Sequence, residues 1–263
     1  MRRPARETRP PALRALPVLA VLAVLFQLFS APAAGAASID LEDDGSYVWR
    51  RGNHYSQDRT LPPDVGKAAF ERVMDPAHLV LTGLGPAKDK TLTVDQDGPA
   101  EMFAILGRVP RLPDEAPTAP GFGYRSHRPG DATVLLVRAD DCPETCDRIY
   151  SFELRSDSRG LPLAENLHPS PGLDTNAATA SGLRLGMTRD EVKAVLGRPQ
   201  EELPDALRYC AIRKLFLSVQ EVLERGRPEK YAKEWQLLYR CIDVTFRDDR
   251  ADSIFILHRL TWD

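Results

Sequence analysis

The feature that most constrains the fold of this chain is an internal similarity between two distant stretches. Residues 101–110 read EMFAILGRVP, and residues 191–200 read EVKAVLGRPQ. The two stretches share five identical residues when Gly107 is aligned with Gly197. Each is followed by three segments in which apolar and polar residues alternate, which is typical of strands. The predicted fold class is therefore α+β: two repeats of short helices packed on one face of an antiparallel sheet.

The second stretch has the start and stop signals of a short helix. Thr188, with Glu191 three residues later, forms a capping box, in which each side chain bonds a backbone N–H group of the first turn. Val192 and Leu196 lie four residues apart, so both fall on one face of the helix. Gly197 ends the helix, because glycine accepts the left-handed backbone conformation found at many helix ends.

The predicted strands have apolar side chains on one face only. Alternate residues of a strand point to opposite sides of a sheet, so a period of two separates a buried face from the other face. In the last two strands the predicted inward residues are Leu238, Ile242, Val244, Phe246, Ile254, Ile256 and Leu260. The six strands are predicted at 123–127, 133–138 and 149–155 in the first unit, and at 206–210, 236–247 and 253–260 in the second.

These units set the boundaries of the other segments. The predicted organisation is a signal peptide at 1–37, an N-terminal extension at 38–90 with a helix at 64–74, a first repeat at 91–156, a linker at 157–180 and a second repeat at 181–263. The linker is rich in Pro, Gly, Ser, Asn and Ala, as loops are. Apolar residues between Cys210 and Trp235 recur at helical spacing and predict an inserted helix.

The N-terminal segment resembles a secretory signal peptide. Residues 1–14 hold five arginines and one glutamate, residues 15–30 carry no charge, and Ala34-Gly35-Ala36 fits a cleavage site. The apolar run is shorter than the roughly 18 to 20 residues of a membrane-spanning helix, and no cysteine near the cleavage site could accept a lipid. The chain is therefore expected to be periplasmic or secreted, without stable membrane insertion after cleavage.

Net charge argues against nucleic acid as a partner. The whole chain has a formal charge of −3, and the five arginines and one glutamate of residues 1–14 contribute +4 of it, which leaves −7 for the rest. Nucleic-acid binding needs a basic face, because phosphate contacts dominate the affinity. No nucleic-acid partner is therefore expected, and no cofactor is expected.

Four cysteines in an exported chain predict structural disulfides. Three pairings are possible, and we favour Cys142–Cys146 with Cys210–Cys241, because Cys210 and Cys241 lie on strand faces opposite the apolar residues. A redox pair is an alternative, but Cys142 and Cys146 have three residues between them where a thioredoxin-type motif has two. A zinc site would need a second compact pair or nearby histidines, and the five histidines are scattered.

Residues 182–199, GLRLGMTRDEVKAVLGRP, resemble the signature of the SmpA/OmlA family of small outer-membrane lipoproteins, part of the superfamily that includes the β-lactamase inhibitor protein. The matching residues are Gly186, Thr188, Glu191, Leu196-Gly197 and Pro199. The resemblance implies helices packed on one side of an antiparallel sheet, a tandem of two units, and binding without catalysis. This chain departs from that family in lacking the lipid-accepting cysteine, which argues against a role in barrel assembly, and no functional residue is carried over.

No catalytic or metal-binding motif stands out, and the chain is not expected to be an enzyme. Aromatic and charged residues do gather on the face of the second sheet away from the predicted core, as at protein-binding surfaces. The candidate partner-binding residues are Trp235, Tyr239, Phe255, Leu257 and Arg208. Alternatively, another segment covers these residues and completes a second small core.

The expected function is that of an exported, non-catalytic protein-binding module of the bacterial envelope, either inhibitor-like or an accessory in envelope assembly. The expected partner is another envelope protein. The alternative is an envelope hydrolase on the same scaffold, which would use a carboxylate such as Asp243 together with a histidine.

Overall fold

The computed structural model describes the chain in several segments: residues 37–51, 58–113, 121–139, 148–161, 164–216, 218–220 and 235–262, without the side chains of 235, 261 and 262. Residues 1–36 of the predicted signal peptide lie outside the described residues. So does the predicted pair Cys142–Cys146.

The helices form where the sequence signals place them. They are α2 (Pro63–Val73), α3 (Pro99–Leu106) and α4 (Arg189–Leu196), with the 3-10 turns η2 (Pro76–Leu79) and η3 (Ala164–Asn166). The predicted capping box is confirmed, because Thr188 Oγ accepts from the backbone N–H of Glu191 and the Glu191 carboxylate accepts from that of Thr188. The predicted helix at 64–74 is confirmed as α2, which begins at a proline.

Fourteen strands are present in the described residues, and most of them form one large sheet. They are β1 (Ala37–Leu41), β2 (Tyr47–Arg51), β3 (Arg59–Thr60), β4 (Val80–Leu84), β5 (Lys90–Thr93), β6 (Gly121–Ser126), β7 (Val134–Ala139), β8 (Ile149–Arg155), β9 (His168–Ser170), β10 (Ala178–Thr179), β11 (Glu201–Glu202), β12 (Ala206–Phe216), β13 (Trp235–Arg247) and β14 (Arg250–Trp262). The large sheet has eleven strands in the order β3-β2-β1-β12-β13-β14-β8-β7-β6-β9, and β11 pairs with β12 off this path. A second sheet has the order β10-β4-β5.

The predicted fold class, two repeats of short helices on one face of an antiparallel sheet, is wrong. β8 pairs directly with β14, so the strands of both predicted units join one sheet. That sheet is mixed, since β1 runs parallel to β12 and β6 runs parallel to β9. The reason for the error is that strand periodicity shows which face a residue occupies, whereas it says nothing about which strands are neighbours.

The predicted helix between Cys210 and Trp235 is also wrong at its start. β12 continues to Phe216, which lies opposite Trp235 of β13. Periodicity alone does not separate a short apolar run in a strand from one in a helix, and the pairing with β13 shows that residues 206–216 form a strand.

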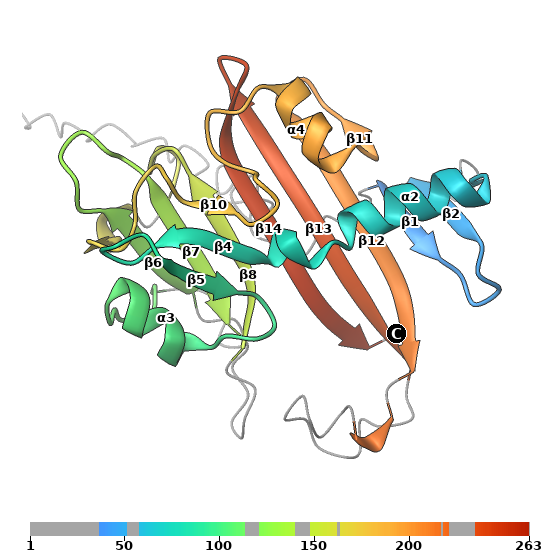
Figure 1. Cartoon of the computed structure of the whole chain (residues 1–263), viewed down its shortest axis with the longest axis horizontal. Helices are drawn as coiled ribbons and strands as arrows, with labels where there is room; N and C mark the ends of the chain where they lie inside the picture. The colour runs from blue at the N-terminus through green and yellow to red at the C-terminus, as the bar shows by residue number, and fades with distance from the viewer. Residues whose placement is uncertain are drawn as a thin grey trace, which may run out of the picture. The chain divides into compact units, whose positions relative to one another are not determined.

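Figure 1 shows α2, α3, α4 and the small sheet lying over one face of the large sheet, and the main hydrophobic core fills the space between these layers. We call this covered face of the large sheet the inner face. It carries Ile242, Val244, Ile254 and Ile256, which are all buried, as the strand periodicity predicts. The residues between them on β13 and β14, such as Cys241 and Asp243, belong to the outer face.

α2 lies unusually close to the N-terminal strands. A β-carbon placed on Gly66 would come 2.3 Å from the Cβ atom of Tyr47 on β2, nearer than two such atoms can approach. The ring of Tyr47 packs on that of Phe70 with centroids 5.6 Å apart. Glycine in a helix interior usually costs stability, and here it permits the close contact that holds α2 on the sheet.

The two short helices α3 and α4 end in the same way. Gly107 and Gly197 follow them with φ angles of 96° and 79°, which favour glycine. The hydroxyl of the buried Tyr124 donates to the carbonyl of Gly107 at 3.0 Å, and that of Tyr209 donates to the carbonyl of Gly197 at 3.2 Å. Burial raises the pKa of both tyrosines, so each remains a hydrogen-bond donor. The two similar sequence stretches therefore share the same arrangement at their helix ends, a glycine whose carbonyl accepts a hydrogen bond from a buried tyrosine.

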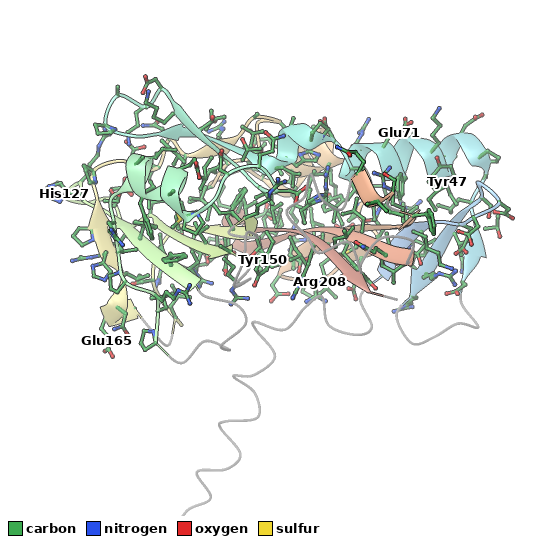
Figure 2. The ribbon with its side chains drawn as sticks, turned by 90° about the horizontal axis from the view of Figure 1, so that it is seen from below. Tyr47, Glu71, His127, Tyr150, Glu165 and Arg208 are labelled. Atoms are coloured by element: carbon green, nitrogen blue, oxygen red, sulfur yellow. A yellow bond between two sulfur atoms is a disulfide. The ribbon has the colours of Figure 1, made fainter. Side chains whose placement is uncertain are left out.

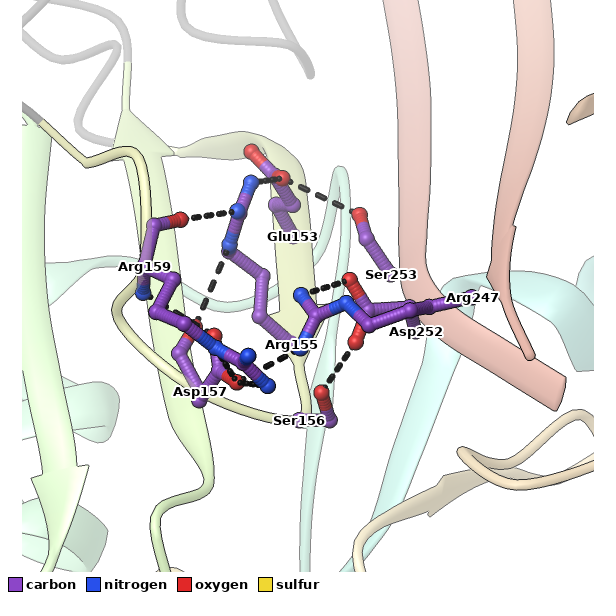
Figure 3. A network of polar contacts seen from close by, with 8 residues as sticks. All are labelled: Glu153, Arg155, Ser156, Asp157, Arg159, Arg247, Asp252 and Ser253. Carbon is purple, nitrogen blue, oxygen red and sulfur yellow. Dashed lines mark hydrogen bonds and ion pairs between the residues drawn. The ribbon is translucent and has the colours of Figure 1, made fainter. Parts of the chain in front are cut away.

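Charged side chains bridge the line where β8 meets the β13–β14 hairpin (Figure 3). Asp157 accepts from Arg247 at 2.8 Å, and the same guanidinium donates to Asp252 at 2.5 Å. Nearby, Ser253 donates to Glu153 at 3.0 Å. Arg247 holds the pKa of Asp157 well below its usual range. This network fastens the two parts of the large sheet together.

The predicted disulfide Cys210–Cys241 is confirmed. The two residues lie opposite each other on β12 and β13, with their Cα atoms 4.1 Å apart. With Tyr150 and Leu257 they form a second, smaller hydrophobic cluster on the outer face. The strand periodicity had predicted both the pairing and the face.

The segment expected to be a linker, residues 157–180, is packed into the fold. It supplies β9 to the large sheet and β10 to the small one. Leu173, Asp174 and Ala177 are completely buried. Proline and glycine in this segment therefore mark turns within a packed region.

Candidate functional site: an arginine-rimmed pocket

A pocket of about 390 Å³ opens on the inner face of the N-terminal strands, where α2 covers them incompletely. It lies between β1–β3, α2 and the segment that follows α4, and its lining residues are Ile39, Trp49, Arg51, Arg59, Leu61, Val65, Ala69, Arg198, Pro199 and Gln200.

The strands place an apolar surface in the pocket. Ile39 of β1 lies opposite Trp49 of β2, and Trp49 lies opposite Arg59 of β3, so these three residues form one row across the sheet. Ile39 is only 3% exposed and forms part of the main core. On the side of α2, Val65 is 57% exposed, an unusual amount for a large apolar side chain. The pocket therefore offers apolar contacts that no described residue fills.

The side chains of two arginines at the pocket, Arg59 and Arg198, have no hydrogen bond or ion pair with any described residue. The neighbouring Arg50, on the opposite face of β2, is in contrast bound by the carboxylates of Asp40, Glu42 and Asp58. These three carboxylates are thus bound to Arg50 on the other face of β2. Arg59 and Arg198 keep their charge available for a ligand.

Gln200 fixes the segment that carries Arg198. Its side-chain oxygen accepts from the backbone N–H of Cys210 at 2.9 Å, and its backbone N–H donates to the carbonyl of Arg208 at 3.0 Å. Gln200 is buried, and these bonds attach the segment after α4 to β12. Arg198 therefore projects from a rigid support.

Chemically, this pocket is suited to binding. Among the described residues that line it, none is a serine, cysteine, histidine, carboxylate or lysine that could act as a nucleophile or a general acid. Guanidinium groups bind carboxylates through two parallel hydrogen bonds. An apolar surface with such groups at its edge fits a ligand with an apolar part and a negative charge.

Sequence reasoning had chosen other residues, on the outer face of β12–β14. Arg208, Tyr239, Phe255 and Leu257 do share that face, on which Figure 2 labels Arg208 and Tyr150. Leu257 is only 5% exposed and packs in the disulfide cluster, with Phe255 against it. The side chain of Trp235 lies outside the described residues.

These contacts favour the second small core for Leu257 and Phe255. Arg208 forms ion pairs with Glu201 at 3.2 Å and Asp243 at 3.9 Å. The predicted interface on this face therefore keeps only Tyr239 and Arg208 as half-exposed residues outside that core.

Asp243, the carboxylate named for the hydrolase alternative, is separated by the sheet from His258, one of the histidines of the chain. Asp243 lies on the outer face, whereas His258 lies on the inner face and accepts a hydrogen bond from Arg240 at 3.1 Å. The sheet stands between these two side chains. Burial raises the pKa of Asp243 to about 6, although Arg208 acts to lower it; Glu201 and Glu153 raise it further.

We therefore expect Asp243→Asn to stabilise the protein near neutral pH. Above about pH 6 the folded protein holds a carboxylate that prefers water, while below about pH 4 both states are protonated. The free energy of unfolding should rise by on the order of 1 kcal/mol at about pH 8 and change little at about pH 4, because the side chain is 32% exposed and water screens its charge. Urea unfolding at the two pH values measures this, and an equal effect at both would contradict it.

In the described part of the chain, Ser181 and His78 form a serine–histidine pair, but its surroundings are structural. The Ser181 hydroxyl lies 2.6 Å from Nδ1 of His78, and Nε2 of His78 lies 2.8 Å from the carbonyl of Arg72. Burial lowers the pKa of His78 and keeps it neutral. The backbone N–H groups of Gly182 and Leu183 are bound to Thr179, so neither can stabilise an oxyanion.

Comparisons of the chain with protein-family models, with curated proteins and with solved structures found no match. The resemblance of residues 182–199 to SmpA/OmlA proteins thus stays a prediction. Among the described helices, none has both the length and the apolar character that a membrane crossing requires. No group of three or more His, Cys, Asp or Glu side chains that could hold a metal ion occurs among the described residues.

Sequence reasoning missed Arg59 and Arg198 because they are distant in the chain. They line one pocket only because the fold brings β3 and the segment after α4 to the same place. One signal was present: Arg198 directly follows Gly197, the residue predicted to end a helix. A charge at that position projects from a fixed turn.

Proposed function

We propose that the protein is an exported, non-catalytic binding protein, and that its arginine-rimmed pocket receives an acidic, apolar peptide segment of a protein partner. The observation that carries this proposal is the pair Arg59 and Arg198, two cations at an apolar pocket whose side chains have no counter-charge among the described residues. Export is supported by the Cys210–Cys241 disulfide, since such bonds persist in oxidising compartments.

A peptide fits the charge distribution better than a nucleic acid or a membrane surface does. Both of those present extended arrays of negative charge and require a broad basic face. This chain is acidic overall, at −3, and offers its positive charge locally at the pocket. A single carboxylate beside an apolar side chain matches a local site of that kind.

The proposal can be tested with a pair of naphthalene probes that differ in charge, anilinonaphthalene sulfonate and the neutral phenyl-naphthylamine. The sulfonate is expected to bind the purified, disulfide-bonded protein more tightly. The double variant Arg59→Gln/Arg198→Gln should weaken sulfonate binding by about tenfold or more, because each charged hydrogen bond contributes about 1.5 kcal/mol. Binding of the neutral probe should stay nearly unchanged.

Arg125→Gln is the matched control, since Arg125 is exposed and does not line this pocket. Peptide display then tests the partner class, with the double variant used for counter-selection. Recovered peptides should carry an aliphatic or aromatic residue close to Asp or Glu. Recovery of basic peptides, or unchanged sulfonate binding by the double variant, would show that the proposal is wrong.

A further inference from the structure

We propose that the protein has a second peptide-binding pocket of the same chemistry, at Arg108 and the aromatic pair Phe103 and Phe122, so that each chain binds two acidic, apolar segments. This inference rests on the proposed function, because it assigns the same class of ligand to a second place in the fold.

The second pocket is an open groove of about 510 Å³ beside α3. Its base is aromatic: the rings of Phe103 and Phe122 stand nearly perpendicular, at 86°, with centroids 5.3 Å apart. Phe122 and Val109 are buried, so the base is rigid. An apolar side chain placed on this base would gain contacts with the aromatic surface.

Arg108 supplies the charge of the groove. Its guanidinium carbon lies 6.0 Å from the centre of the Phe103 ring, and the side chain is exposed. Arg108 has no ion pair with a described residue, so its donors can reach a carboxylate of a ligand. The groove thus repeats the combination found in the first pocket, an apolar base with a guanidinium at its edge.

The two pockets are also built in the same way from the backbone. Arg108 follows Gly107 at the end of α3, and Arg198 follows Gly197 at the end of α4. In each case the hydroxyl of a buried tyrosine donates to the glycine carbonyl, Tyr124 to Gly107 and Tyr209 to Gly197. These hydrogen bonds fix the turns that carry the two arginines. The same turn therefore places an arginine at each pocket, although the other residues that line the two pockets differ.

Figure 1 shows α3 and α4 over different parts of the large sheet, so the two pockets are separate sites. A partner with two acidic, apolar segments would be held at both. Joining two such segments should raise the affinity well above that of either one, because the second contact forms within the same complex.

Calorimetric titration with anilinonaphthalene sulfonate tests the inference. Two sites per chain are expected for the wild-type protein. Arg108→Gln should weaken one of them by about tenfold, Arg59→Gln/Arg198→Gln should weaken the other by a similar factor, and the triple variant should weaken both. Arg125→Gln serves as the control, and an unchanged melting temperature shows that Arg108→Gln, at an exposed position, still folds.

The possible failures can be told apart. If Arg108→Gln leaves the titration unchanged while the Arg59/Arg198 variant loses a site, the second pocket is excluded and the proposed function stands. If the Arg59/Arg198 variant changes nothing, the proposed function fails by itself. A single site that only Arg108→Gln weakens would also overturn the two-site inference.

Discussion

Replacing Cys210 and Cys241 together by alanine is expected to lower the free energy of unfolding by about 3 to 4 kcal/mol. The bond joins residues 31 positions apart, and a crosslink of that span removes much of the conformational freedom of the unfolded chain. Both cysteines are also buried against Leu257 and Tyr150, so their loss removes apolar contacts.

Urea unfolding of the double variant beside the wild-type protein measures this effect. Thr245→Ala is the matched control, because Thr245 lies on the same face of β13 and is exposed. The control should change the free energy of unfolding by less than about 0.5 kcal/mol. If the alanine double variant unfolds at the same urea concentration as the wild type, the disulfide contributes little, and the link between folding and an oxidising compartment is lost.

Local features of the fold were predictable because they depend on neighbouring residues. The capping box of Thr188 and Glu191 and the glycine end at Gly197 are read from a few positions. The faces of β13 and β14 follow from a period of two, which also predicted that Cys210 and Cys241 could meet. Each of these features depends on residues within one helix, or on strands whose alternation of apolar and polar residues is clear.

The arrangement of the strands was not predictable from the same signals. β1 joins the sheet beside β12 and parallel to it, although residues 37–41 had been placed at the boundary of the signal peptide and the N-terminal extension. β8 and β14 become neighbours through backbone hydrogen bonds, which any sequence can form. The pocket depends on these pairings, so Arg59 and Arg198 could not be brought together from the sequence.

The buried ion cluster at Asp174 shows the same limit in a segment that had been expected to be a linker. Asp174 is 0% exposed; its carboxylate lies 3.2 Å from Nζ of Lys88 and 2.7 Å from a guanidinium nitrogen of Arg128, and it accepts from the N–H of Asn176 at 2.9 Å. Composition suggested a loop here. Asp174 instead attaches this segment to two loops, the one between β4 and β5 through Lys88 and the one between β6 and β7 through Arg128.

Asp174→Asn is expected to lower the free energy of unfolding by about 3 to 5 kcal/mol, because it leaves the largely buried ammonium of Lys88 without a nearby counter-charge. Arg128 is 54% exposed, so Arg128→Gln should cost less than about 1 kcal/mol. The double variant Lys88→Met/Asp174→Asn should lose less stability than the losses of Lys88→Met and Asp174→Asn added together. The reason is that the double variant also removes the ammonium that Asp174→Asn leaves without a counter-charge. Urea unfolding of the wild type, Lys88→Met, Asp174→Asn and the double variant measures this coupling. Strict additivity would contradict this prediction, because it would mean that Lys88 and Asp174 contribute to stability independently of each other.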